Sequence, residues 1–259
     1  MKKIIVIILL IGLVFIGISL FLAKYKKEKE ILINPTFEST QMILVRAHDW
    51  NSIMGILQLY ERKTTKDAWV KVGNRMGVSL GKKGLGWGVG LHGTALTDGP
   101  IVSEGMKRSP VGAFALNLAF GQNKNKDKLD IKVPYIPITD TTFCPDDPKS
   151  RYYNRIIDSK KVNRDWGSAE DMYKYMIEGY YTYGVVIEHN YSNTKPGLGS
   201  CFFLHVYRGF GIPTEGCTAV SLDQMEKIIT WLDPSKKPIL VQLPDAVFIK
   251  LQKQWNLPE

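Results

Sequence analysis

Short apolar and β-branched runs, separated by Asn, Gly, Lys and Asp clusters, dominate the chain between residues 41 and 116. Runs of this kind are typical of strands that pair with their sequence neighbours, so this half is expected to form antiparallel sheet. The expected strands are 41–45, 52–60, 68–72 and 113–116. Many glycines around Trp87, over residues 81–93, indicate turns or a close approach of two backbones.

The second half mixes strands with helices. A capping-box pattern at 221–224 opens one expected helix, which ends before Pro234. Helical spacing of apolar residues predicts two further helices, and β-prone runs predict three further strands. The helices are 168–177 and 245–255, and the strands are 183–189, 201–207 and 238–243. We therefore expect a mainly β fold, a β-sandwich or mixed sheet with a few peripheral helices, forming one domain over residues 41–259.

The first residues do not fit a globular domain, because residues 4–23 are apolar and uncharged, roughly the length that spans a bilayer. Bulky Phe21 stands where a cleaved signal peptide carries a small residue. We expect an uncleaved membrane anchor over residues 1–23, with a cleaved signal peptide as the alternative, and a tether over 24–40. Lysines are more numerous after the apolar run than before it, which by itself would leave the domain in the cytoplasm.

The formal net charge is +9, and part of it lies in the lysine cluster at 24–29, which would attract anionic lipids. No zinc-ligand spacing, helix-turn-helix pattern or aromatic RNA-binding signature accompanies this charge, so nucleic acid is not an expected partner. No metal or cofactor is expected either. The three cysteines, Cys144, Cys201 and Cys217, are an odd number without a Cys-x-x-Cys pair, so at least one stays unpaired within the chain. Whether Cys144 and Cys201 pair is open.

Cys217 has the setting that nucleophilic chemistry needs. A cysteine nucleophile requires a base and donors for the oxyanion. His205, at the end of an expected strand, is the candidate base. Gly216 would give a substrate carbonyl clearance, and backbone N–H groups near Glu215 would hold the oxyanion. A Cys/His pair alone is more often a buried thiol and a structural histidine.

Several ordered segments resemble the catalytic domain of the L,D-transpeptidase family. His205 followed by Thr214-Glu215-Gly216-Cys217 resembles the family's active-site motif, in which a histidine precedes Ser/Thr-x-Gly-Cys. Segment 104–114 resembles its Lys-Thr-Pro-x-Gly-x-Phe region. Segments 144–154, 165–172 and 199–205 are similar to those of one subgroup. The resemblance covers most of the chain between residues 41 and 243.

This resemblance implies a peptidoglycan enzyme of the cell envelope, on the extracytoplasmic side of the membrane. Cys217 would attack the carbonyl before the terminal D-alanine of a stem tetrapeptide, and His205 would act as general base and then acid. The resulting thioester would pass to an amine of a neighbouring stem, as in a transpeptidase, or to water, as in an L,D-carboxypeptidase. A catalytically inactive wall-binding module is a further alternative. A papain-type protease is disfavoured, because its cysteine precedes its histidine.

The chain departs from the family pattern where substrate would be held. Val206 and Glu215 replace a glycine and a histidine, and Ala219 replaces an arginine expected to bind a substrate carboxylate. Arg208 is the candidate for supplying that charge. Further candidate substrate contacts are Thr214, His189 and Asn190. His92 resembles the family's His-Gly segment, but it precedes the Pro110-Val111-Gly112 region, so a structural role is expected.

Overall fold

The computed structural model describes residues 15–22, 24–25, 34–94, 98–123 and 129–259. The membrane segment expected over residues 1–23 lies mostly outside these ranges. Within it, residues 15–22 form a short helix with exposed side chains. Of the helices in the described ranges, none has both the length and the apolar character that crossing a membrane requires.

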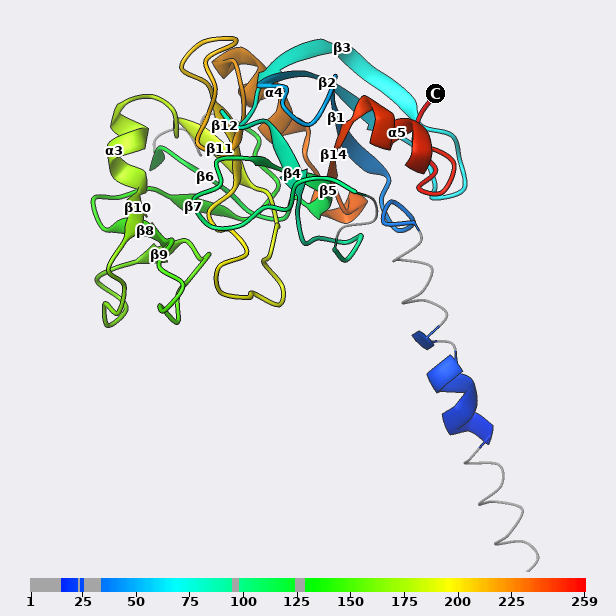
Figure 1. The fold of residues 1–259 in the computed structure, drawn as a ribbon, viewed down its shortest axis with the longest axis horizontal. Helices are drawn as coiled ribbons and strands as arrows, with labels where there is room; N and C mark the ends of the chain where they lie inside the picture. Colours follow the sequence, from blue (N-terminus) through cyan, green and yellow to red (C-terminus); the bar gives the residue numbers. More distant parts are fainter. Residues whose placement is uncertain (1–14, 23, 26–33, 95–97, 124–128) are drawn as a thin grey trace, which may run out of the picture.

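A long mixed sheet dominates the domain, which confirms the expected mainly β fold (Figure 1). Eleven strands of the described residues pair in the order β4 (Leu85–Trp87), β5 (Ser109–Ala115), β14 (Ile239–Pro244), β1 (Gln41–Ala47), β2 (Met54–Glu61), β3 (Val70–Ser79), β13 (Thr218–Val220), β12 (Phe203–Val206), β11 (Tyr183–Val186), β6 (Ala119–Gly121) and β7 (Tyr135–Pro137). Strands β1, β2 and β3 are antiparallel, as expected. The β1–β14 and β12–β13 pairs are parallel, however, and bring distant segments together.

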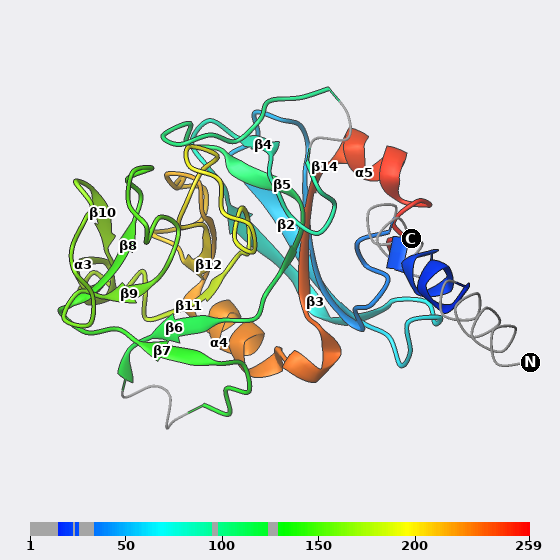
Figure 2. The same ribbon diagram turned by 90° about the horizontal axis from the view of Figure 1, so that it is seen from below.

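The two halves of the sheet share one hydrophobic core. Val45 and Leu57, from β1 and β2, belong to the same buried cluster as Val185 and Leu204, from β11 and β12. Helix α4 (Leu222–Trp231) adds three buried side chains to this cluster, and α5 (Asp245–Leu251) flanks β14 (Figure 2). The capping box expected at Ser221 is formed. The strands that carry the candidate site are therefore fixed by packing on both faces.

A smaller layer of β10 (Ala169–Asp171), β8 (Thr142–Pro145) and β9 (Ile157–Asp158) lies beside β11, β12 and their connections. Its helix α3 (Met172–Ile177) begins later than the expected residue 168, because residues 169–171 pair with β8 instead. A disulfide between Cys144 and Cys201 joins this layer to the segment before β12. Cys217 is thereby left as the free thiol.

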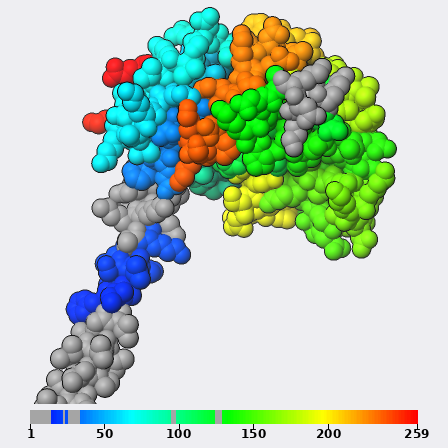
Figure 3. Space-filling view, turned by 180° about the vertical axis from the view of Figure 1, so that it is seen from behind, coloured from blue at the N-terminus to red at the C-terminus, as the bar shows by residue number. Residues whose placement is uncertain are grey.

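The end of the segment expected as a tether is part of the domain. Thr36 and Ser39 are buried, and the Arg62 guanidinium donates hydrogen bonds to both of their carbonyls. The Thr36 hydroxyl also donates to the carbonyl of Trp255. Seen from behind, the blue chain start of the domain lies against the orange segment that leads into β14 (Figure 3). Residues 36–39, expected as part of the tether, thus pack on the domain.

Candidate active site

The candidate base lies on β12, and the candidate nucleophile directly precedes the neighbouring parallel strand β13. His205 pairs with Ala219 on β13, and Cys217 is two residues before Ala219. This placement brings the side chains of His205 and Cys217 to one cavity.

The thiol of Cys217 is held among backbone groups. The N–H of Phe203 donates to Sγ at 3.4 Å, and Sγ donates to the carbonyl of Cys201 at 3.6 Å. Burial, with a smaller contribution from the carboxyl of Glu170, raises the pKa of the Cys217 thiol. Cys217 is therefore a protonated thiol at rest, and its use as a nucleophile would require a base.

His205 is the candidate for such a base. Burial lowers its pKa to about 4, so the imidazole is neutral at physiological pH and has a lone pair to accept a proton, but the same shift makes it a weaker base. The Val206 carbonyl lies 2.8 Å from Nδ1, and the Tyr180 carbonyl also faces the ring. These two acceptors would stabilise the imidazolium that forms when the ring takes a proton. The Tyr181 ring packs edge-on against the imidazole, with centroids 5.2 Å apart, and fixes its orientation.

Cys217 and His205 line a common cavity of about 140 Å³. Glu170 and Tyr181 line it too, and the Tyr181 hydroxyl donates a hydrogen bond to the Glu170 carboxyl. Burial raises the pKa of Glu170 to about 8. Within the described residues, no hydrogen bond joins the imidazole to the thiol. Proton transfer therefore needs a rotation of the thiol or a water molecule in this cavity, which has room for several.

Two hydroxyl groups hold the main chain at the nucleophile. The Cys217 carbonyl accepts hydrogen bonds from Thr214 Oγ1 at 2.6 Å and from Ser109 Oγ at 3.0 Å. Thr214 Oγ1 in turn accepts from the N–H of Gly216. Thr214 lines the cavity, but its hydroxyl is engaged with this loop. The Thr214 hydroxyl thus positions the main chain of Cys217. No contact of Thr214 with substrate is needed to account for its place in the cavity.

Gly216 has a conformation that favours glycine, with φ of 143°. A Cβ atom at this position would lie 2.8 Å from the Phe202 ring, so the glycine admits Phe202 as well as opening the space before the thiol. The N–H groups of Glu215 and Cys217 belong to residues that line the cavity, so they are the candidates for binding an oxyanion, the role expected for this segment.

A second cavity, of about 200 Å³, reaches Cys217 from another side. It is lined by Lys107, Glu104 and Gly216, whereas the first cavity is lined by Arg208. The Arg208 guanidinium stacks over the Tyr180 ring at 4.8 Å. The structure therefore brings Arg208, the candidate carboxylate ligand, to the cavity that holds the imidazole and the thiol.

His189 and Asn190 are not brought to this site. Both are buried and line neither cavity at Cys217. The His189 ring accepts from the N–H of Val89 and faces the Leu198 carbonyl, and the Asn190 amide bridges residues 195 and 199. Their polar atoms are satisfied by backbone groups. This placement gives both residues a structural role and does not support their interpretation as substrate contacts.

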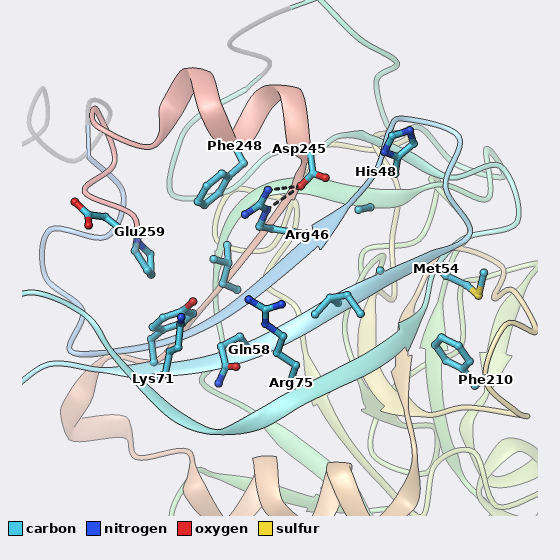
Figure 4. A pocket seen from close by; sticks show the side chains of 16 residues that line it. Arg46, His48, Met54, Gln58, Lys71, Arg75, Phe210, Asp245, Phe248 and Glu259 are labelled. Atoms are coloured by element: carbon cyan, nitrogen blue, oxygen red, sulfur yellow. Dashed lines mark hydrogen bonds and ion pairs between the residues drawn. The ribbon is translucent and has the colours of Figure 1, made fainter.

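A larger groove, of about 580 Å³, lies apart from the candidate nucleophile (Figure 4). Its floor is the face of β1, β2 and β3 that carries Gln58 and Arg75, and α5 forms one wall. Arg46 on the floor forms an ion pair with Asp245 at 2.7 Å. The groove contains neither Cys217 nor His205, so its size alone does not make it the reactive site. Over the described ranges, no group of three His, Cys, Asp or Glu residues could hold a metal ion.

Comparison with models of protein families, with curated proteins and with solved structures found no match to this chain. The fold and the arrangement around Cys217 are therefore interpreted from the chain's own residues.

Several residues at the site carry no local signal in the sequence. Lys82, Lys107 and Glu170 reach Cys217 or its loop from three separate segments. Only the pairing of those segments in space brings them together. Lys107 and Ser109 stand in segment 104–114 and Glu170 in segment 165–172, which resemble the family, but nothing in either segment indicates which of their side chains reaches Cys217. The contact of Ser109 with the Cys217 carbonyl gives segment 104–114 a physical function.

Proposed function

We propose that the protein is a cysteine-dependent peptidoglycan L,D-transpeptidase that acts on stem tetrapeptides. The observation that carries the proposal is that His205, on β12, and Cys217, directly before the paired strand β13, line one cavity. The order of the resembling motifs along the sequence supports the substrate class. Cys217 stays a free thiol although the other two cysteines form a disulfide, and this supports a role for its thiol as a nucleophile.

The proposed reaction has two steps. The Cys217 thiol gives its proton to His205, and Sγ forms a bond to the carbonyl carbon before the terminal D-alanine. The tetrahedral oxyanion accepts hydrogen bonds from the N–H groups of Cys217 and Glu215. The C–N bond then breaks, and the imidazolium protonates the departing amine. An amine of a second stem resolves the thioester in transpeptidation, while water does so in carboxypeptidation.

An extracytoplasmic location follows from the same proposal. Peptidoglycan lies outside the cytoplasmic membrane, and disulfides such as Cys144–Cys201 persist in oxidising compartments. The apolar segment at residues 4–23 would tether the domain to the membrane. We give these two observations more weight than the lysine count, which favours the opposite orientation.

The test is incubation of the purified full-length chain with a stem tetrapeptide, followed by mass spectrometry. We expect release of D-alanine and a mass increase on the Cys217 peptide equal to the acyl donor. Crosslinked dimer identifies transpeptidation, and tripeptide without dimer identifies carboxypeptidation.

Cys217→Ala is the control and should give neither product nor adduct. If the unaltered chain binds the tetrapeptide but forms no adduct or product, the protein is a wall-binding module instead.

A further inference from the structure

Two lysines converge on the carboxylate of Glu215, two residues before the nucleophile. Lys82 Nζ lies 2.7 Å from Oε1, and Lys107 Nζ lies 3.1 Å from Oε2. Each carboxylate oxygen thus has its own ammonium partner, one from each side. Glu215 lines both cavities at Cys217, so this charge cluster lies at the mouth of the reactive site.

The main chain fixes both lysines at the nucleophile loop. The Lys82 N–H donates to the Thr214 carbonyl at 2.9 Å, and the Lys83 N–H donates to the Lys107 carbonyl at 3.1 Å. The segment that carries Lys82 runs close to the segment that carries Lys107. A Cβ atom added at Gly81 would lie 2.5 Å from the Lys107 carbonyl oxygen. The main chain therefore holds both lysines beside the nucleophile loop, and Lys107 lines the second cavity at Cys217.

The partner of these lysines is easily displaced. The Glu215 side chain is 71% exposed, and each lysine side chain is about 40% exposed (39% and 42%). Ion pairs this exposed contribute little to stability, because water competes for both charges. An arriving carboxylate could take the place of Glu215, while the Glu215 side chain turns into solvent.

We propose that Lys82 and Lys107 form a binding site for a carboxylate of the acyl donor, and that Glu215 occupies this site in the resting protein as an internal competitor. The inference rests on the proposed function and names residues that would select its substrate. Ala219 cannot bind a carboxylate. Arg208 lies in the other cavity, over Tyr180, and remains available for a second carboxylate.

The experiment measures acylation of Cys217 in the full-length chain with three tetrapeptide donors. One donor has all carboxylates free, one has its terminal carboxylate amidated, and one has the side-chain carboxylate of its third residue amidated. The lysines are removed together as Lys82→Ala/Lys107→Ala. Lys83→Ala is the matched control, because Lys83 carries the same charge on the neighbouring position without contacting Glu215.

We expect the double substitution to raise KM for the free donor about tenfold, with kcat nearly unchanged. For the donor that lacks the bound carboxylate, the effect should vanish. Glu215→Gln should lower KM for the free donor several-fold, and Lys83→Ala should change nothing. Equal losses for all three donors, or no loss at all, would overturn the carboxylate site.

Binding of the same donors to the Cys217→Ala chain separates this inference from the proposed function. If that chain binds the free donor about tenfold more weakly after loss of both lysines, the carboxylate site stands, even where the unaltered chain forms no acyl-enzyme. If acylation proceeds but neither KM nor binding depends on the lysines, the proposed function is supported and the proposed carboxylate site is wrong.

Discussion

His205 and His92 are alike in most of the properties that describe a buried histidine. Both are nearly inaccessible to solvent, and both face backbone carbonyls. Burial lowers the pKa of each to about 4. A lowered pKa therefore does not by itself identify a catalytic histidine in this fold.

The two histidines differ in what surrounds the ring. His92 is enclosed by the rings of Trp87, Phe114 and Trp255, with centroids 5.6–5.7 Å away. The N–H of Ala113 donates to its Nδ1, and Gly112 leaves a gap that a Cβ atom would fill by overlapping the imidazole. His205 instead shares a cavity with a thiol. Access to a thiol separates the candidate base, His205, from the enclosed ring of His92.

The largest expected effect tests His205. His205→Gln should slow acylation of Cys217 by about 10²–10⁴-fold, because it removes the group that accepts the thiol proton. The measurement is the rate of adduct formation by mass spectrometry, and the unfolding midpoint serves as the control for folding. Acylation at the unaltered rate in a folded variant would show that His205 is not the base.

His92→Ala should have the opposite profile. It leaves a cavity among three aromatic rings and an unpaired Ala113 N–H, which should lower the free energy of unfolding by about 2–4 kcal/mol. Urea denaturation measures this loss. At temperatures where the variant stays folded, its acylation rate should remain within a few-fold of that of the unaltered chain. If a folded His92→Ala variant showed no acylation, the assignment of a structural role to His92 and of a base to His205 would be wrong.

The smallest effect concerns Glu170, which lies at His205 and not at His92. With a pKa of about 8, its carboxyl is neutral at pH 7 and becomes negative above pH 8, where it opposes formation of the nearby thiolate. The acylation rate should therefore fall as pH rises through about 8. Glu170→Gln should lose this fall, and His92→Ala should keep it. A fall that persists in Glu170→Gln would assign it to another group.

The same shift affects stability. The folded-state pKa of Glu170 lies above its ordinary value of 4.5, so the neutral carboxyl stabilises the folded chain at low pH. That contribution is lost as pH rises from about 4.5, where the carboxyl of the unfolded chain ionises, to about 8, where the folded one does. The unfolding midpoint of Glu170→Gln should therefore fall less between these two pH values than that of the unaltered chain.

Local patterns in the sequence predict the strands and helices well, and long-range pairing poorly. The runs at β1 and β2 and the capping box at Ser221 depend on neighbouring residues, so the sequence reveals them. The parallel pairing of β1 with β14 joins segments about 200 residues apart, and no local pattern encodes it. The late start of α3 has the same cause, because pairing with β8 overrides the helical spacing of residues 169–171.

The candidate site divides in the same way. Cys217 and His205 stand in a recognisable order in the chain, and the pairing of β12 with β13 brings them to one cavity. His189 is the last residue of the run expected as a strand, 183–189, and this predicts a position near the site. The backbone leaves the sheet after Val186, however, and both His189 and Asn190 turn into the packing around residues 195–199. The sequence shows that both residues are polar, but it does not show that the chain turns away from the sheet before them.

The disulfide beside the nucleophile also affects how the protein is made. Three cysteines allow three different single pairings during oxidation, and two of these consume Cys217. Exchange between these pairings needs an attacking thiolate. In the folded chain the raised pKa keeps Cys217 protonated, although its Sγ contacts the carbonyl of Cys201. Completed folding therefore protects the correct pairing, and the vulnerable period for this thiol is the interval of oxidation before β12 and β13 have paired.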